Sequence, residues 1–324
     1  MSRHPAPVPG ESGREPVVSV VAPAYNEVET LKEFHRRVAS ALEGEEFELV
    51  LVNDGSTDGT AELLEQLAGT DHRVRPVHLA RNFGHQAAVT AGIDLARGDA
   101  VITIDADLQD PPEVIPRLLG AWRDGAEVVH AVRHVRPGEP RYRLLAIRWF
   151  YRTFARIAGL PDFPGNSGDF RLIGRRAVEV LTMMPERNRF IRGLVSWVGF
   201  RQVSVEYERD ARFAGTSKYP LRKLMRLAFD GIVSFSAVPL KLASVLGLVF
   251  SGVAFLAIPV VVILRLLGLY EVSGIASVHI LVLLIGGLQL VFLGIAGEYI
   301  ARNYDEAKGR PMYVIGPPPP GERT

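Results

Sequence analysis

Two aspartates at a spacing of two residues are the strongest chemical signal in this sequence. Asp105 and Asp107 follow the short apolar run 100–104 and lead into the sequence Gln-Asp-Pro-Pro-Glu at 109–113. Carboxylates so placed beyond the end of a strand can face one cleft, where they repel each other unless a cation lies between them. Their hard oxygen atoms suit Mg²⁺ or Mn²⁺, which can bridge to a diphosphate and offset the charge that develops on a leaving group.

Two more polar motifs follow apolar runs of strand length. The sequence Pro-Ala-Tyr-Asn-Glu occupies 23–27, and Asn-Asp-Gly-Ser-Thr-Asp-Gly occupies 53–59. Each alone could be ordinary turn chemistry, because Asp, Asn, Gly and Pro are common in loops and Ser or Thr can cap a helix. Three acidic loops at the ends of three predicted strands instead indicate a shared ligand site.

Alternating strands and helices would place these loops together. The pattern predicts four strands and, between them, three helices: strands at 17–22, 47–52, 74–79 and 100–104, and helices at 28–42, 57–67 and 84–96. Continuously apolar strands that alternate with helices predict an α/β fold with a mostly parallel sheet covered on both faces. In such sheets ligands bind at the carboxyl ends of the strands, where all three motifs fall.

The composition changes near Lys241, where two long apolar stretches begin. Residues 242–264 carry no charge, and residues 275–297 include only His279 and Gln289 as strongly polar side chains. As helices, each would reach about 35 Å, enough to cross a hydrocarbon core of roughly 30 Å. A pair of buried helices in a large soluble core is the alternative, but two adjacent stretches of this length favour a membrane hairpin.

Basic residues on the flanks of this hairpin predict its orientation. Arg222, Lys223, Arg226 and Lys241 precede the first span, and Arg302, Lys308 and Arg310 follow the second, whereas the loop 266–274 carries only the acidic Glu271. Because basic flanks remain on the cytoplasmic side, we expect the large N-terminal region and both termini in the cytoplasm of a plasma-membrane protein.

Composition excludes several other classes of function. The 324 residues carry a net charge of +1 and contain no cysteine, so there is no global attraction to nucleic acid and no disulfide, thiolate or cysteine-ligated metal chemistry. Residues 1–15 have no apolar run and are expected to be disordered rather than a secretory signal. The proline run at 317–320 predicts an extended tail.

The three motifs, together with Arg-Asn-Phe-Gly at 81–84, resemble family 2 glycosyltransferases. Within that family the chain is similar to the polyprenyl-phosphate branch, which comprises dolichol-phosphate mannose synthases and bacterial polyprenyl-phosphate glucosyltransferases. The resemblance runs from about residue 17 to about residue 302 and includes the paired membrane helices.

The resemblance implies a GT-A fold, inversion at the anomeric carbon and a set of residue roles. Pro23, Tyr25, Glu27 and Asp54 would hold the base and ribose, Asp105 would lie beside the nucleotide, and Asp107 and Gln109 would bind the metal. Asp169 matches an acidic residue near the acceptor, Arg133 matches an arginine near the acceptor phosphate, and Arg212 and Lys218 match a basic loop that closes over the phosphates.

The implied reaction is transfer of a sugar from a nucleotide-sugar to polyprenyl phosphate, undecaprenyl or dolichyl. UDP-glucose is the favoured donor because the resemblance is strongest to bacterial glucosyltransferases, and GDP-mannose and UDP-N-acetylglucosamine are alternatives. A phosphate monoester is largely dianionic at neutral pH and is already a nucleophile. We therefore expect Asp169 to orient the acceptor more than to act as an obligatory base, and the arginines to offset the repulsion between two anions.

The sequence divides into five regions. These are a tail at 1–15, a cytosolic catalytic domain at 16–219, a juxtamembrane amphipathic helix at 220–240, two membrane helices within 241–299 and a cytosolic tail at 300–324. Residues 141–158 read as a basic amphipathic helix at the membrane interface, although a helix docked on the catalytic domain is the alternative. A homo-oligomer is an open possibility.

Two competing functions remain. A processive family 2 polysaccharide synthase would carry a QxxRW motif, whereas this chain has Asn-Arg-Phe-Ile-Arg-Gly at 188–193 followed by Trp197. A non-catalytic membrane scaffold would be expected to have lost acidic residues such as Asp105, Asp107 and Asp169, all of which are present.

Overall fold

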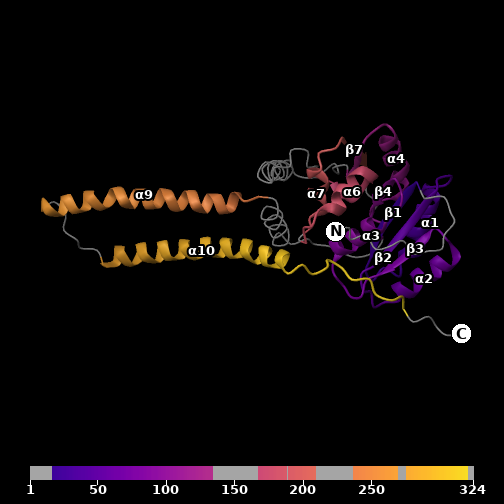
Figure 1. The fold of residues 1–324 in the computed structure, drawn as a ribbon, viewed down its shortest axis with the longest axis horizontal. Helices are drawn as coiled ribbons and strands as arrows, with labels where there is room; N and C mark the ends of the chain where they lie inside the picture. The colour runs from indigo at the N-terminus through magenta and orange to yellow at the C-terminus, as the bar shows by residue number, and fades with distance from the viewer. Residues whose placement is uncertain (1–16, 134–166, 188, 209–235, 269–274, 320–324) are drawn as a thin grey trace.

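The computed structural model describes residues 17–133, 167–187, 189–208, 236–268 and 275–319 (Figure 1). Several expectations fall outside these residues: the N-terminal tail, the interfacial helix at 141–158, most of the juxtamembrane helix at 220–240, and the basic-loop residues Arg212 and Lys218.

A seven-stranded sheet in the order β3-β2-β1-β4-β6-β5-β7 forms the centre of the N-terminal part. Its strands are β1 (Val18–Ala24), β2 (Phe47–Asn53), β3 (Val74–His78), β4 (Ala100–Thr103), β5 (Val128–Arg133), β6 (Ser167–Gly174) and β7 (Gln202–Tyr207). Only β6 runs antiparallel to its neighbours, β4 and β5. The predicted α/β fold with a mostly parallel sheet is therefore confirmed.

Helices cover both faces of the sheet. On one face lie α1 (Leu31–Ala41), α2 (Thr60–Thr70) and α4 (Ile115–Arg123), and on the other lie α3 (His85–Leu95), α6 (Arg175–Met183) and α7 (Ile191–Trp197). Successive side chains of a strand point to opposite faces, so Val20 joins the first core and Val21 joins the second. This two-sided burial explains why the strands are apolar throughout.

Helix α3 lies unusually close to the sheet because of Gly92. A Cβ atom at that position would be 2.2 Å from Cγ1 of Val21 in β1. The small residues Ala88 and Ala91 on the same helix are fully buried. This tight contact fixes the N-terminal end of α3, including His85, at the carboxyl edge of the central strands.

Two helices begin about three residues later than their apolar pattern predicted. The carbonyl of Glu27 accepts hydrogen bonds from the N–H groups of Thr30 and Leu31, so α1 starts at Leu31. Asp58 accepts hydrogen bonds from the backbone and hydroxyl of Thr60, so α2 starts at Thr60. The residues thus left in loops, 28–30 and 57–59, lie beside the polar motifs.

Two long apolar helices, α9 (Val238–Leu266) and α10 (Ile275–Ala307), project together from the globular part (Figure 1). The apolar segments within them, Val238–Leu264 and Leu281–Ala307, have mean hydropathies of 2.6 and 2.0. The most apolar 18-residue stretch of each segment is not buried inside the protein. They form the candidate membrane hairpin expected from the sequence. Helix α10 continues beyond the predicted end at residue 297, where Arg302 pairs with Glu298 one turn earlier at 3.1 Å.

The segment after α10 returns to the globular part. Ile315 pairs with Leu79 at the outer edge of the sheet, where Ala80 donates to the carbonyl of Val314 and Gly316 donates to the carbonyl of His78, both at 2.8 Å. The hydroxyl of Tyr313 also donates to Asp94 of α3 at 3.1 Å. We refer to residues 309–316 as the C-terminal strap.

Candidate active site

A cleft of about 360 Å³ lies at the carboxyl ends of β1, β2 and β4. Six of the predicted site residues line it, namely Pro23, Tyr25, Glu27, Asp54, Asp105 and Asp107, together with Ala24, Asn82, Gly84, His85, Ala88 and Ala106. The parallel strands thus bring three loops into one place. Gln109 is buried beneath the cleft rather than lining it.

Asp54 organises the loop 81–84. Its carboxylate accepts hydrogen bonds from the N–H groups of Phe83 and Gly84 at 2.7 and 3.0 Å, and the residue is only 3% exposed. The motif that follows β2 therefore shapes the motif that follows β3.

The loop after β1 is held by the loop after β2. Asn26 has a left-handed backbone with φ of 57°, which is uncommon for a residue other than glycine. Its side-chain carbonyl accepts from the N–H of Thr57, and its own N–H donates to the hydroxyl of Ser56. Tyr25 consequently stands 49% exposed at the mouth of the cleft.

Glu27 contributes a carboxylate that faces the acidic loop after β4. Burial raises its pKa, as do the charges of Asp107 and Asp58, although the hydroxyl of Thr30 donates to it at 2.8 Å and opposes the rise.

Asp105 is the least satisfied acidic group of the cleft. Its Oδ1 atom is buried and accepts no hydrogen bond from the described residues. Burial, together with the charges of Asp169, Asp107 and Asp110, raises the pKa of Asp105 to about 6, although the charge of His85 opposes the rise. Any cation that enters the cleft would stabilise the ionised form of this carboxyl group.

The chain itself would supply only part of a metal site. Asp107 accepts hydrogen bonds from the backbone N–H and the Nε2 amide of Gln109, at 3.0 and 2.6 Å. Within the part of the chain that the structure describes, no group of three or more His, Asp or Glu side chains could hold a metal ion. The orphaned oxygen of Asp105 and the oxygen donors beside it fit a hard divalent cation that completes its shell with substrate oxygens, as Mg²⁺ commonly does.

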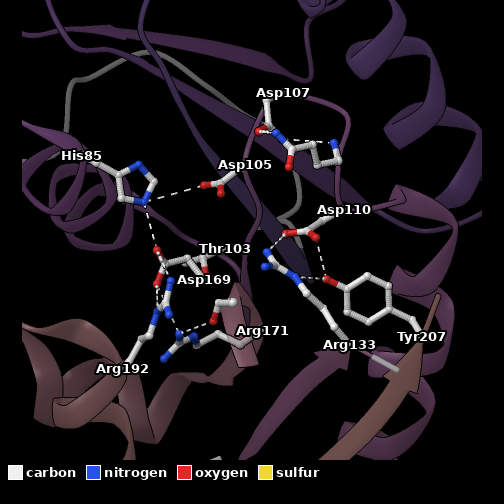
Figure 2. A network of polar contacts seen from close by, with 12 residues as sticks. His85, Thr103, Asp105, Asp107, Asp110, Arg133, Asp169, Arg171, Arg192 and Tyr207 are labelled. Carbon is white, nitrogen blue, oxygen red and sulfur yellow. Dashed lines mark hydrogen bonds and ion pairs between the residues drawn. The ribbon is translucent and has the colours of Figure 1, made fainter. Parts of the chain in front are cut away.

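Asp169, in β6, lies at the centre of a second charged network (Figure 2). Arg192 donates to both carboxylate oxygens at 2.8 and 3.2 Å, Arg171 donates at 3.3 Å, and Nε2 of His85 lies 3.1 Å away. Burial alone would raise the pKa of Asp169, but the hydrogen bonds from His85 and Arg192 and the nearby positive charges hold it well below its usual range. The group is therefore a stable carboxylate and a weak proton acceptor.

His85 joins the two acidic regions. Its Nε2 atom lies 3.1 Å from Asp169 and 3.7 Å from Oδ1 of Asp105, and Figure 2 shows the ring between them. Burial lowers the pKa of His85, but the hydrogen bond to Asp169 and the charges of both aspartates outweigh this effect and raise it. A positively charged imidazole here would reduce the repulsion between two carboxylates.

Arg133 belongs to a third cluster, with Asp110 and Tyr207 (Figure 2). The hydroxyl of Tyr207 donates to Asp110 at 2.5 Å and accepts from Nε of Arg133 at 3.2 Å, while Nη2 of Arg133 lies 3.3 Å from Asp110. Burial and the Asp110 carboxylate raise the pKa of Tyr207 above its usual value. The hydroxyl therefore keeps its proton.

Sequence reasoning missed the roles of His85, Arg192, Arg171, Asp110 and Tyr207. Three of them stood within reach, because His85 directly follows the motif at 81–84, Asp110 lies inside the acidic motif and Arg171 lies two residues after Asp169. Arg192 and Tyr207 reach the site from α7 and β7, and nothing in their local sequence marks them.

The chain is similar in sequence to known proteins of one family. Residues 19–182 match the family model described as "Glycosyl transferase family 2". The chain is 46% identical to an uncharacterized glycosyltransferase of Bacillus subtilis, with 92% of each protein covered. It is 42% identical to a prophage bactoprenol glucosyl transferase homolog of Escherichia coli, covering 92% of this chain and 98% of the relative. The bactoprenol glucosyl transferase of Shigella phage SfII is 43% identical over 92% of this chain and 97% of that protein.

Proposed function

Because this chain belongs to glycosyl transferase family 2, we propose that it moves a sugar from a nucleotide-sugar to a polyprenyl phosphate lipid at the cytoplasmic face of the membrane. The sheet and its cleft are the GT-A arrangement expected of the family. The observation that carries the proposal is the combination of three features in one chain. These are an acidic cleft, a neighbouring network in which Arg192 pairs with Asp169, and an exposed apolar hairpin.

Glucose from UDP-glucose is the proposed donor substrate. Relatives 42–43% identical over nearly their whole length are named bactoprenol glucosyl transferases. A bactoprenol-type acceptor also suits a chain whose apolar helices project from the catalytic domain (Figure 1), since the lipid and the hairpin would share one membrane.

The donor would bind with its base and ribose against Pro23, Tyr25, Glu27 and Asp54, and with its phosphates near Asp105. Tyr25 is exposed at the mouth, where a planar base could stack on it. Asp107 and Gln109 would hold Mg²⁺ or Mn²⁺, which when bound would offset the charge that develops on the departing diphosphate. The buried Oδ1 atom of Asp105, which accepts no hydrogen bond from the described residues, supports this assignment.

The acceptor side supplies orientation and positive charge. An oxygen of the acceptor phosphate attacks the anomeric carbon as the bond from that carbon to the donor diphosphate breaks, with inversion, and a nucleoside diphosphate leaves. The dianionic phosphate has no proton to lose, so a strong base is unnecessary. Asp169, with its lowered pKa, would keep Arg192 and His85 aligned, while Arg133, Arg212 and Lys218 would contact phosphate groups.

The hairpin would anchor the enzyme as a two-pass plasma-membrane protein. Basic residues on both outer flanks of the hairpin, and an acidic residue in its loop, support a cytoplasmic catalytic domain and cytoplasmic termini. The basic amphipathic sequence at 141–158 would lie in the headgroup layer close to the acceptor.

A transfer assay tests the proposal directly. Purified full-length protein in detergent would be incubated with undecaprenyl phosphate, Mg²⁺ or Mn²⁺, and radiolabelled UDP-glucose, GDP-mannose or UDP-N-acetylglucosamine, and label in the organic phase counted. We expect lipid-linked label from UDP-glucose alone. A chelator or Asp107→Ala should reduce the rate by at least about 100-fold, the loss typical of a removed electrostatic group.

The exposed Asp124, at the end of α4, provides a matched control. Asp124→Ala should leave the transfer rate unchanged. Folded wild-type protein that labels the lipid from none of the three donors would exclude the proposed function.

A further inference from the structure

The Arg133 cluster is assembled from three separate segments at one end of the sheet. Arg133 ends β5, Tyr207 ends β7, and the two are register partners in parallel strands. Asp110 comes from the loop after β4, directly after Gln109. The loop that would hold the metal ligands therefore also contacts Arg133.

Exposure differs sharply among these three residues. Asp110 is 1% exposed and Tyr207 is 4% exposed, whereas 31% of the Arg133 side chain is accessible. The ring of Tyr207 packs edge-on against Phe170, with centroids 5.7 Å apart and an interplanar angle of 77°. Asp110 and Tyr207 thus form a buried support, and Arg133 is the member that a ligand can reach.

Gly168 makes room for the guanidinium group. A Cβ atom at residue 168 would lie 2.8 Å from Nη2 of Arg133 and 3.4 Å from its Cζ. Any side chain there would displace Arg133, and Gly168 immediately precedes Asp169. The guanidinium group of Arg133 therefore lies beside the part of β6 that carries Asp169.

We propose that Tyr207 and Asp110 are positioning residues that hold Arg133 ready to bind the phosphate group of the lipid acceptor, an inference that rests on the proposed function. A guanidinium group binds phosphate through a planar fork, so its orientation matters as much as its charge. Fixing that fork before binding removes part of the entropic cost of ordering a long side chain. The Tyr207 hydroxyl is well suited to this task because it donates to Asp110 while it accepts from Arg133.

Tyr207→Phe separates positioning from simple packing. The variant keeps the ring against Phe170 and removes only the hydroxyl. We expect KM for undecaprenyl phosphate to rise about tenfold, the effect of one charge-assisted hydrogen bond, with KM for the donor and kcat at saturating acceptor within about twofold of wild type. In an Arg133→Ala background the same change should add almost nothing, because the arginine that it positions is gone.

Tyr313 offers a matched control. Its hydroxyl also donates to an aspartate, Asp94, at 3.1 Å, and the residue lies on the C-terminal strap. Tyr313→Phe should leave KM for the acceptor unchanged. If Tyr207→Phe does not fold, Asp110→Asn is expected to show the same selective rise in acceptor KM.

Three results would count against the inference. An unchanged acceptor KM in folded Tyr207→Phe would overturn it, as would an equal rise in the donor and acceptor constants. If Tyr207→Phe raised the acceptor KM as strongly in the Arg133→Ala background as in wild type, the tyrosine would act independently of the arginine. Wild-type protein that transfers no sugar would instead overturn the proposed function, and this inference with it.

Discussion

At the scale of single residues, Asp169 shows how an environment selects a chemical role. Two arginines and a histidine surround its carboxylate, so it remains ionised far below neutral pH. A group that resists protonation so strongly cannot readily accept a proton during the reaction. Under the proposed function, Asp169 would align Arg192 and His85 and would not act as a base.

We predict that Asp169→Asn lowers kcat/KM for the acceptor by at least about 100-fold, because Arg192 and His85 lose the charge that orders them. Steady-state kinetics with varied undecaprenyl phosphate would measure the change. Asp71 is the matched control, since it also pairs with an arginine (Arg73, 2.7 Å) and a histidine (His35, 2.9 Å) but lies outside the cleft. Asp71→Asn should reduce thermal stability and leave kcat/KM intact; equal kinetic losses in the two variants would refute the assigned role.

At the scale of secondary-structure elements, a part-buried hydrogen bond joins His130 of β5 to Gln202, the first residue of β7. His130 is 2% exposed, and its Nε2 atom lies 2.8 Å from the side-chain oxygen of Gln202, so the ring donates there. Burial, together with the charge of Arg171, lowers the pKa of His130 to about 4, although the hydrogen bond to Gln202 opposes the shift. The folded state therefore holds this histidine neutral.

This pairing makes stability depend on pH. In the unfolded chain His130 takes up a proton near pH 6.5, whereas in the folded chain it does so only near pH 4. The stabilisation of the folded state by neutral His130 is therefore complete above pH 6.5 and is lost as the pH falls toward 4. At pH 5 this effect lowers the free energy of unfolding by about 2 kcal/mol. We predict that Tm of the detergent-solubilised protein falls less steeply between pH 7 and pH 5 in His130→Gln than in wild type. His72→Gln, at an exposed histidine, should follow the wild-type slope, and a His130→Gln slope equal to wild type would contradict the prediction.

At the scale of the whole molecule, the C-terminal strap joins the hairpin to the catalytic domain. Glu306, near the end of α10, accepts a hydrogen bond from the N–H of Arg187 at 2.8 Å, and the strap then pairs with the outer edge of the sheet. That edge leads directly into the loop 81–84, which Asp54 holds against the cleft. The second apolar helix is thus connected through the strap and the loop 81–84 to the wall of the cleft.

We predict that Gly316→Pro weakens this connection. Proline removes the N–H that donates to His78, and its ring atoms would crowd Cα of Ala80, which a Cβ atom at residue 316 would approach to 2.9 Å. A loss of about 1 kcal/mol or more of stability should accompany a severalfold rise in donor KM. Differential scanning fluorimetry and donor kinetics would measure both effects, with Pro318→Ala, at an exposed position beyond the pairing, as the control. Unchanged donor KM despite a lower Tm would limit the strap to a stabilising role.

Local patterns in the sequence determined much of this protein. Continuous apolar runs predicted strands that are buried on both faces, helical spacing predicted the covering helices, and long uncharged stretches predicted the hairpin. The acidic loops could be placed together before the structure was known, because parallel strands end at one edge. Motif resemblance supplied the family.

Only the tertiary structure decided which charges meet. Asp169 lies 84 residues from His85 and 23 from Arg192 along the chain, and Tyr207 lies 97 residues from Asp110. These partners depend on strand register and on the close packing of α3 against β1, which local periodicity does not encode. The docking of the strap has the same origin, since a short polar tail carries no signal of its own and is held by the unpaired backbone groups of an edge strand.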